Sequence, residues 1–222
     1  MKPALAVMAK APQAGKTKTR LCPPFTLEQA AEIYAACVSD VIENALAVPG
    51  VESFVAVTPL DGRAYFETAA PGVNVLAVEG ATIGRCLDTV LTELLTRGHP
   101  RAAAVSGDSP DLWPEIISRG FDLLDEAHVV YGPSHDGGYY FVGLKQPAPA
   151  LFSDEIAWST DVVLAQSLAC AERANLKVAF LPGGVTDVDT GADIELLRQS
   201  LANQPATRAR NVRKLLNQLI LS

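Results

Sequence analysis

The chain has 222 residues, of which 49% are hydrophobic and 19% charged, and its formal net charge is −7. These values are typical of one globular domain with a substantial core, and the acidic balance argues against nucleic acid as a partner. The four cysteines form no C-x-x-C pair and have no histidine at zinc-ligand spacing, so neither a disulfide framework nor a structural zinc is indicated. No apolar run has the length of a membrane span and no signal peptide is recognisable, so we expect a cytoplasmic protein without a membrane span.

Short apolar runs alternate with amphipathic segments along the chain. Strands are predicted over 4–8, 53–57, 73–78, 102–105, 127–131, 139–144 and 177–181. Helices are predicted over 27–47, 83–97, 112–125, 160–173, 191–202 and 206–220. This alternation predicts a three-layer α/β/α fold, with a mainly parallel sheet that binds ligands at the carboxyl ends of its strands. Because 139–144 follows the preceding strand across a glycine turn, we expect an antiparallel edge. Residues 1–222 are predicted to form a single domain.

The first predicted strand leads into a basic loop, AKAPQAGKTKTRL (9–21). This loop holds four of the chain's 18 lysines and arginines: Lys10, Lys16, Lys18 and Arg20. It is not a P-loop, because Lys10 stands where a Walker A motif requires its first glycine and Pro23-Pro24 would break the helix that must follow. Backbone N–H groups around Gly15 and the loop's cations are suited to wrapping a diphosphate. A solvated charge run is the alternative.

Two acidic segments follow predicted strands. Asp108 comes just after the strand 102–105, where an α/β sheet binds ligands, although an Asx turn is the alternative. Asp111 is better placed to cap the next helix. Asp187 and Asp189 follow the strand 177–181 and share a face in extended backbone. Two adjacent carboxylates repel unless a cation lies between them, and Mg²⁺ or Mn²⁺ accepts such ligands together with phosphates.

Alternative interpretations remain for the other polar and aromatic positions. Asp189 or Thr190 also suits the cap of the helix that begins near Gly191, and Asp193 is expected at the start of that helix. Composition alone favours a hairpin turn over a ligand site at Asp136-Gly137-Gly138. A core position explains Trp158 without a ligand.

Five ordered blocks carry a resemblance to a known family. The first, K-A-P-x-x-G-K-x-K-T-R-L, resembles the signature of a bacterial family of the DUF2064 type. That family is related to GT-A-fold glycosyltransferases and described as nucleotide-diphospho-sugar transferases; its distant relatives are molybdopterin-cofactor and phospholactate guanylyltransferases. The other blocks are SGDSPDLWP (106–114), YGPSHDGGYYFVGL (131–144), LFSDEIAWST (151–160) and DVDTGAD (187–193). Residues 83–86 depart from the family's Leu-Gly-x-Arg element, so Arg85 is assigned no role.

The resemblance implies a GT-A-like fold over nearly the whole chain and assigns the site. It implies nucleotide binding by Lys10, Pro12, Gly15, Lys16, Lys18, Thr19 and Arg20. It implies a divalent metal, Mg or Mn, at Asp108, Asp187 and Asp189, and acceptor or sugar binding by Asp136, Gly137 and Gly138. Catalysis is expected from Asp136 and Asp108, with Glu155 as a second candidate base.

The expected function is metal-dependent glycosyl transfer from a nucleoside diphosphate sugar to a small-molecule acceptor. One alternative is a nucleotidylyltransferase that moves a nucleoside monophosphate from an NTP to a small phosphorylated acceptor and releases pyrophosphate. A second alternative is a nucleotide-binding protein without turnover. The sequence leaves open the base, the sugar, the acceptor, the stereochemical outcome and the oligomeric state.

Overall fold

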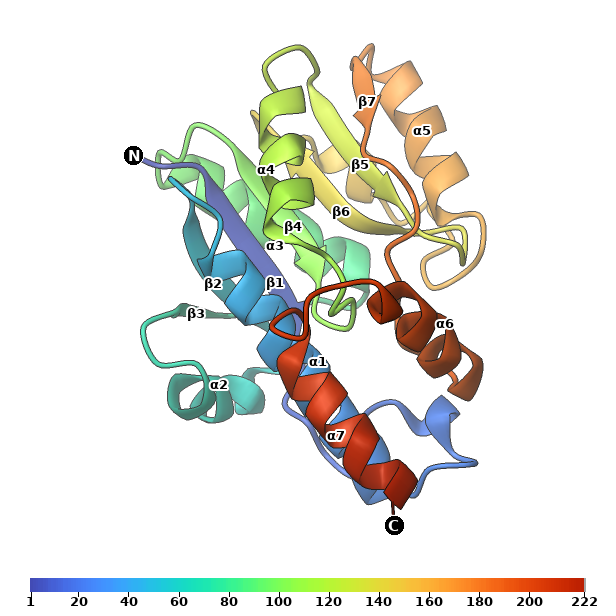
Figure 1. Cartoon of the computed structure of the whole chain (residues 1–222). Coiled ribbons are helices and arrows are strands. Elements are labelled where there is room, and N and C mark those ends of the chain that lie inside the picture. The colour runs from blue at the N-terminus through green and yellow to red at the C-terminus, as the bar shows by residue number, and fades with distance from the viewer. Residues whose placement is uncertain (222) are drawn as a thin grey trace.

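A seven-stranded sheet with the order β3-β2-β1-β4-β6-β5-β7 crosses the computed structural model, which describes residues 1–221 and side chains as far as Leu219 (Figure 1). The strands are β1 (Ala4–Ala9), β2 (Glu52–Val57), β3 (Asn74–Ala77), β4 (Ala102–Ser106), β5 (Val129–Pro133), β6 (Tyr139–Leu144) and β7 (Val178–Phe180). The helices are α1 (Leu27–Leu46), α2 (Arg63–Ala69), α3 (Ile83–Thr96), α4 (Pro114–Leu123), α5 (Val163–Arg173), α6 (Gly191–Ala202) and α7 (Arg210–Leu221). All the predicted elements are therefore present; β6 and α6 have the predicted bounds, and the others are shifted at one or both ends.

The predicted mainly parallel sheet is confirmed, and residues 139–144 run antiparallel as expected, but they do not form an edge strand. The antiparallel strand is β6, which lies inside the sheet between β4 and β5, while β7 pairs parallel to β5 and forms the edge. The hairpin between β5 and β6 folds β6 back against β4, so β7 can pair only with the outer side of β5. The short helix α2 was not predicted, because its seven residues are too few for a helical period to stand out.

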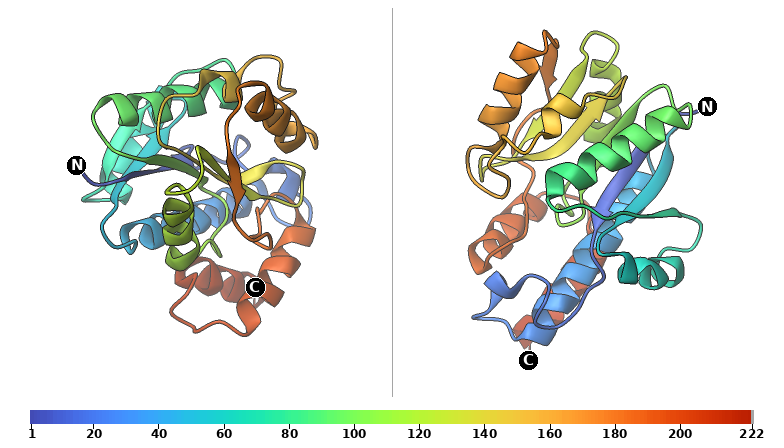
Figure 2. Two further views of the ribbon diagram at one scale, coloured as in Figure 1. Left: turned by 90° about the horizontal axis from the view of Figure 1, so that it is seen from above. Right: turned by 180° about the vertical axis from the view of Figure 1, so that it is seen from behind.

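Each strand divides its side chains between the two faces of the sheet. In β1, Leu5 and Val7 pack with α1 and α4 on one face, while Ala4 and Ala6 pack with α3 and α5 on the other. This alternation follows from the two-residue period of an extended strand. Figure 2 shows the two helical layers, with α3 in front when the molecule is seen from behind. No helix in the described part of the chain combines the length and apolar character needed to cross a lipid bilayer.

A further layer, formed by α6 and α7, covers the outer side of α1. Its core contains Ile33 and Cys37 from α1, Leu197 from α6, and Val212 and Leu216 from α7. Both helices lie at the end of the sheet where the parallel strands finish (Figure 1). The layer thus stands beside the edge at which ligands are expected.

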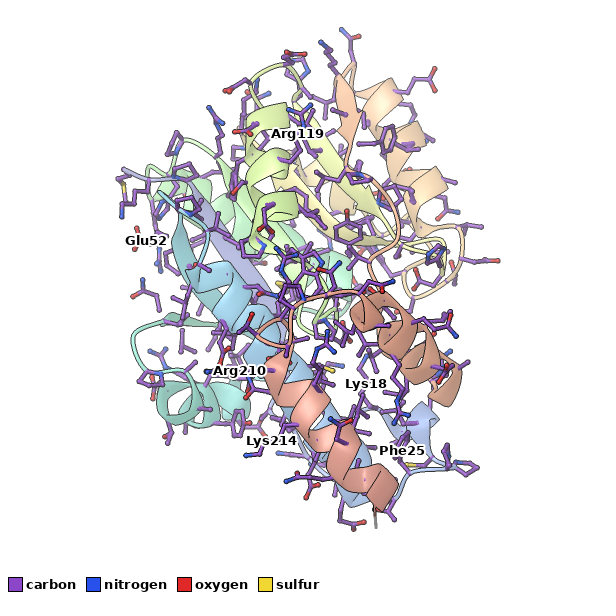
Figure 3. The ribbon with its side chains drawn as sticks, in the orientation of Figure 1. Lys18, Phe25, Glu52, Arg119, Arg210 and Lys214 are labelled. Carbon is purple, nitrogen blue, oxygen red and sulfur yellow. The ribbon has the colours of Figure 1, made fainter. Side chains whose placement is uncertain are left out.

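The start of α7 is fixed by a carboxylate from α1. Asp40 is buried and accepts hydrogen bonds from the backbone nitrogens of Asn211 and Val212 at 3.0 and 2.9 Å. At the surface beside it, Arg210 donates to Glu43 at 2.8 Å, and Figure 3 labels Arg210 at the start of this helix. Asp40 therefore supplies acceptors to backbone donors that have no partner within the helix.

The strands β1, β4, β5 and β7 run parallel to one another. Their carboxyl ends therefore meet at one side of the sheet, which we call its carboxyl edge. In β1 and β4 the register pairs Met8 with Ser106, so the loops that follow both strands start side by side. β6 runs the other way, so its first residue, Tyr139, lies at the same edge. Segments 10–26, 107–113, 134–138 and 181–190 are therefore brought together by topology alone.

We predict that Asp40→Ala lowers the free energy of unfolding by about 1–3 kcal/mol, because buried N–H groups of α7 lose their acceptor. The measurement is urea unfolding. Glu43→Ala is the matched control and should cost less than about 1 kcal/mol, since its ion pair with Arg210 is exposed. Equal losses in the two variants would show that Asp40 does not hold α7.

Candidate functional site

The Lys18 ammonium joins two of the three predicted acidic ligands. Its Nζ contacts Oδ2 of Asp108 and lies 2.7 Å from Oδ1 of Asp189. The Lys18 side chain is only 9% exposed, although it starts in the basic loop. Arg20 reaches the other oxygen of Asp189 at 3.2 Å from the solvent side. Figure 3 labels Lys18 in the region between the basic loop and α6. We call Lys18, Asp108, Asp187 and Asp189 the charge cluster.

The two acidic segments are tied together through their backbones. The N–H of Val188 donates to the carbonyl oxygen of Asp108 at 3.1 Å. Asp111, which the sequence placed as a helix cap, is buried and does not cap α4. Its carboxylate instead accepts from the backbone N–H of Thr186 at 2.9 Å and from the hydroxyl of Ser200 at 2.8 Å. Asp111 therefore positions the segment that carries Asp187 and Asp189.

The start of α6 fixes the backbone of Asp189. Thr190 is the N-cap, and the Asp193 carboxylate completes the capping box by accepting from the backbone N–H of Thr190 at 2.6 Å. The same carboxylate oxygen accepts from the N–H of Asp189 at 3.1 Å. The expected place of Asp193 is confirmed. Because Thr190 and Asp193 do the capping, the Asp189 side chain can face Lys18.

Electrostatics within the charge cluster depend on burial and on Lys18. Burial alone would lower the pKa of Lys18, but Asp108, Asp187 and Asp189 raise it above its ordinary value. Burial alone would raise the pKa of Asp108, but the positive charge of Lys18 brings this pKa below its usual range. Burial and the neighbouring Asp108 raise the pKa of Asp187. One ammonium thus compensates Asp108 and Asp189, whereas Asp187 has no cation of its own within the described chain and its charged form is disfavoured.

The donor set fits a hard divalent cation, although the side chains would have to shift. Among the described residues, no three His, Cys, Asp or Glu side chains stand in metal-binding geometry. Within the same residues, Oδ1 of Asp187 is buried and accepts no hydrogen bond. Mg²⁺ and Mn²⁺ prefer carboxylate oxygens, which Asp108, Asp187 and Asp189 offer around the Lys18 ammonium. A cation held by these carboxylates would take the place of that ammonium.

On one side of the charge cluster, the basic loop encloses a cavity of about 330 Å³, which we call the loop cavity. Of the predicted nucleotide-binding residues, Lys10, Lys16, Lys18, Thr19 and Arg20 line it, together with Asp108 and Asp189. Pro12 and Gly15 are not among the lining residues. Gly15 instead has a φ of 76°, which suits the turn that brings Lys16 back toward the sheet.

The sequence did not single out two residues that shape the loop cavity. Thr17 is buried, and its hydroxyl accepts from the N–H of Gln13 at 3.1 Å and donates to the carbonyl of Gln13 at 3.0 Å. The Tyr34 hydroxyl accepts from the N–H of Lys10 at 2.9 Å, and Lys18 Nζ lies 5.9 Å from the centre of the Tyr34 ring. Thr17 stands inside the recognised loop motif, whereas the contact of Tyr34 is a product of the tertiary fold.

On the other side of the charge cluster lies a second cavity of about 570 Å³, which we call the turn cavity. Its lining comprises Ser134, Asp136, Gly138, Tyr139, Trp158, Ser159, Thr160, Asp161, Val163, Ile83 and Leu87, and also Lys10, Arg20, Asp108, Asp187 and Asp189. Two of the three predicted acceptor residues, Asp136 and Gly138, are therefore brought to it. Oδ1 of Asp136 accepts from the N–H of Gly138 at 3.0 Å and from the hydroxyl of Ser134.

Gly137, the third predicted acceptor residue, has a packing role. Its φ is 84°, and a Cβ at this position would overlap the backbone carbonyl of Asp161. Its own carbonyl accepts from the N–H of Leu164 at 2.9 Å. Gly137 therefore holds the β5–β6 turn against the segment that leads into α5.

Trp158 contributes to the turn cavity, whereas Glu155 and Arg85 lie in surface ion pairs. Trp158 packs on Gly84 as a partly buried side chain and also lines the turn cavity, so its ring serves both the core and the site. Glu155 pairs with Arg173 at 2.8 Å and belongs to the lining of neither cavity. Arg85 pairs with Asp154 at the surface.

We predict that Lys18→Met lowers the free energy of unfolding in a chelating buffer by about 3–5 kcal/mol, because removing one partner leaves buried carboxylates without compensation. Denaturant unfolding at neutral pH measures the loss. The matched control is Lys16→Met, in which an exposed lysine with no ion pair among the described residues is replaced, and its effect should stay within about 0.5 kcal/mol. A small loss in Lys18→Met would mean that the carboxylates do not depend on Lys18.

Comparison with solved structures supports the fold. A protein of Desulfovibrio desulfuricans G20, assigned as a nucleotide-diphospho-sugar transferase, is 25% identical, with a TM-score of 0.89, and the match covers 97% of this chain and 94% of that one. CMP:2-keto-3-deoxy-manno-octonic acid synthetase in complex with CTP has a TM-score of 0.61 at 13% identity, with coverage of 92% and 100%. A Mycobacterium tuberculosis H37Rv protein in complex with manganese has a TM-score of 0.52 at 17% identity, with coverage of 90% and 100%.

The fold is thus that of the nucleotide-diphospho-sugar transferases, as the sequence predicted. Among curated proteins, none shows significant sequence similarity to this chain. The family described as "Uncharacterized protein conserved in bacteria (DUF2064)" matches residues 41–160, which is more than half of the 222 residues. The chain therefore belongs to the DUF2064 family, in agreement with the resemblance carried by its sequence blocks.

Proposed function

We propose that the protein is a transferase that moves a glycosyl group from a nucleoside diphosphate sugar to a small hydroxyl-bearing acceptor, with Mg²⁺ or Mn²⁺ as cofactor. The observation that carries the proposal is the position of the charge cluster between two cavities. Asp108 and Asp189 line both the loop cavity and the turn cavity. A donor on one side and an acceptor on the other would meet at these carboxylates.

The loop cavity is suited to the diphosphate of the donor. Lys10 and Lys16 line it and have no ion pair within the described chain, so both ammonium groups are available to phosphate oxygens. Arg20 stands at the border and shares only one oxygen of Asp189. A nucleoside diphosphate that departs from the sugar gains negative charge, and cations already in place stabilise this charge without reorganisation.

The metal would be held by Asp108, Asp187 and Asp189. When bound, it supplies positive charge to the phosphate oxygens of the leaving group. The manganese complex of a protein with the same fold is consistent with this choice of ion. Lys18, displaced from the carboxylates, would remain in the loop cavity as a further cation near the diphosphate.

Asp136 is the proposed general base on the acceptor side. It lines the turn cavity and does not belong to the lining of the loop cavity. Its Oδ1 is oriented by Ser134 and Gly138, which directs the remaining carboxylate oxygen to another partner. The acceptor hydroxyl would give its proton to Asp136 while its oxygen bonds to the anomeric carbon. The bond from that carbon to the diphosphate oxygen breaks, and the nucleoside diphosphate leaves with the electron pair.

Nucleotidyl transfer is the second candidate, because a synthetase in complex with CTP shares the fold. The same residues would then face an NTP, the attacked atom would be phosphorus, and pyrophosphate would be released. A nucleotide-binding protein without turnover would release neither product. The products therefore separate the three functions.

We predict that one nucleoside diphosphate sugar, with Mn²⁺, raises the melting temperature of the protein. Bound ligand stabilises the folded state by about 2.7 kcal/mol at 100 times its Kd. Asp189→Ala should abolish the Mn²⁺-dependent part of the shift, whereas Asp122→Ala on the exposed surface of α4 should retain it. A shift given only by an NTP, with pyrophosphate release, would favour nucleotidyl transfer. Ligand binding without either product would favour the non-catalytic alternative.

We predict that Asp136→Asn lowers kcat by about 10²–10⁴-fold, because the amide cannot accept the acceptor's proton. The affinity for the donor should not change, since Asp136 stands outside the loop cavity. Steady-state kinetics and donor titration measure the two effects separately. Unchanged turnover would remove Asp136 from the mechanism, and parallel losses of kcat and donor affinity would place it on the donor side.

A further inference from the structure

The two cavities differ in the sign of their charges. Beyond the residues shared with the loop cavity, the charged side chains of the turn cavity are Asp136, Asp161 and Asp187, all of which are acidic. Its two cations, Lys10 and Arg20, also line the loop cavity, and we call the residues common to both cavities the shared border. Arg20 is also paired with Asp189. The part of the turn cavity away from the border therefore carries only negative charge.

Asp136 and Asp161 form the acidic wall of this part. Neither makes an ion pair with any residue that the structure describes. They come from different segments, which the contacts of Gly137 with Asp161 and Leu164 hold together. Figure 1 shows the β5–β6 turn beside the segment that leads into α5. The two exposed carboxylates consequently lie on one surface.

Cations at the charge cluster do not neutralise the negative charges of Asp136 and Asp161. A bound metal would be held by Asp108, Asp187 and Asp189, and the displaced Lys18 would face, with Lys10 and Lys16, a donor that brings its own negative charge. Asp136 and Asp161 stay without compensation. A phosphate or carboxylate on the acceptor would therefore meet like charges in this part of the cavity.

The same cavity has an aromatic and apolar side. The Trp158 ring is held by its packing on Gly84 and by a hydrogen bond from Nε1 to the carbonyl of Ser153 at 3.2 Å. Tyr139 and Leu87 continue this surface. Aromatic faces attract cations and pack well against the C–H faces of small molecules. This surface suits a ligand that combines an apolar face with hydrogen-bond donors.

We infer that the acceptor presents hydroxyl or ammonium groups to Asp136 and Asp161 and carries no anionic group. This inference rests on the proposed function and names the acceptor class for the same site. It also separates this protein from a nucleotidylyltransferase that acts on a phosphorylated acceptor. Asp161 is assigned as a specificity-determining residue, because its carboxylate repels anions without belonging to the charge cluster.

The test uses four compounds of similar size: glucose, glucosamine, glucose 6-phosphate and gluconate. Their binding to the protein loaded with Mn²⁺ and a nucleoside diphosphate is measured by saturation-transfer NMR and calorimetry. We expect glucosamine and glucose to bind and the two anions to bind more weakly than glucose. Asp161→Asn should weaken the binding of glucosamine about 10-fold or more, as loss of a charge-assisted hydrogen bond does. It should also reduce the difference in affinity between glucose and glucose 6-phosphate.

Asp122→Asn is the matched control and should leave all four affinities unchanged. Tighter binding of glucose 6-phosphate or gluconate than of glucose would overturn the inference, and so would failure of all four compounds to bind. Nucleotide and Mn²⁺ binding is measured in the same samples before the sugars are added. Failure at that step would count against the proposed function, whereas an anion preference with intact donor binding would count only against the acceptor class.

Discussion

The rest of the site depends on charge compensation by the Lys18 ammonium. It reaches Asp108 and Asp189, residues that are 90 and 171 positions away in the sequence, and joins the loop after β1 to the loops after β4 and β7. Without a cation these loops would bring carboxylates together at a buried position, where like charges repel strongly. A divalent ion can take the same role only by replacing the ammonium. Under the proposed function, the metal-bound state and the state without ligand would be two solutions to one electrostatic problem.

The sheet brings the loops after β1, β4 and β7 together, and buried polar contacts fix the positions of the carboxylates that these loops carry. Parallel strands deliver the loops to one edge, but their ends alone would leave Asp187 and Asp189 free to take several positions. Asp111 removes that freedom by holding Thr186 and Ser200, and Asp193 fixes the backbone of Asp189. Asp111, Asp193 and Ser200 all lie outside the charge cluster. The outer layer of α6 and α7 therefore contributes to the site, because α6 supplies two of the anchors, Asp193 and Ser200.

Local pattern was sufficient for the strands, the long helices, the basic loop and the acidic segments, because each rests on periodicity, turn chemistry or a short motif. It was insufficient where a contact joins distant segments. Asp111 has the local signature of a helix cap, yet a buried partner 75 residues away takes its carboxylate. Gly137 has the signature of a hairpin turn, and β5 and β6 form that hairpin, but its packing against Asp161 is not encoded in the signature. The position of β6 inside the sheet likewise depends on which strands pair, and a single strand does not encode that choice.

The absence of space at Gly137 restricts how the turn cavity can diversify. Any side chain there would collide with a backbone carbonyl, which no rotamer change relieves, and the positive φ adds to the difficulty. The β5–β6 turn is therefore a fixed boundary of the turn cavity. Where relatives line this cavity differently, the differences would have to lie in side chains of residues 158–161 or of α3, which can change without moving the backbone.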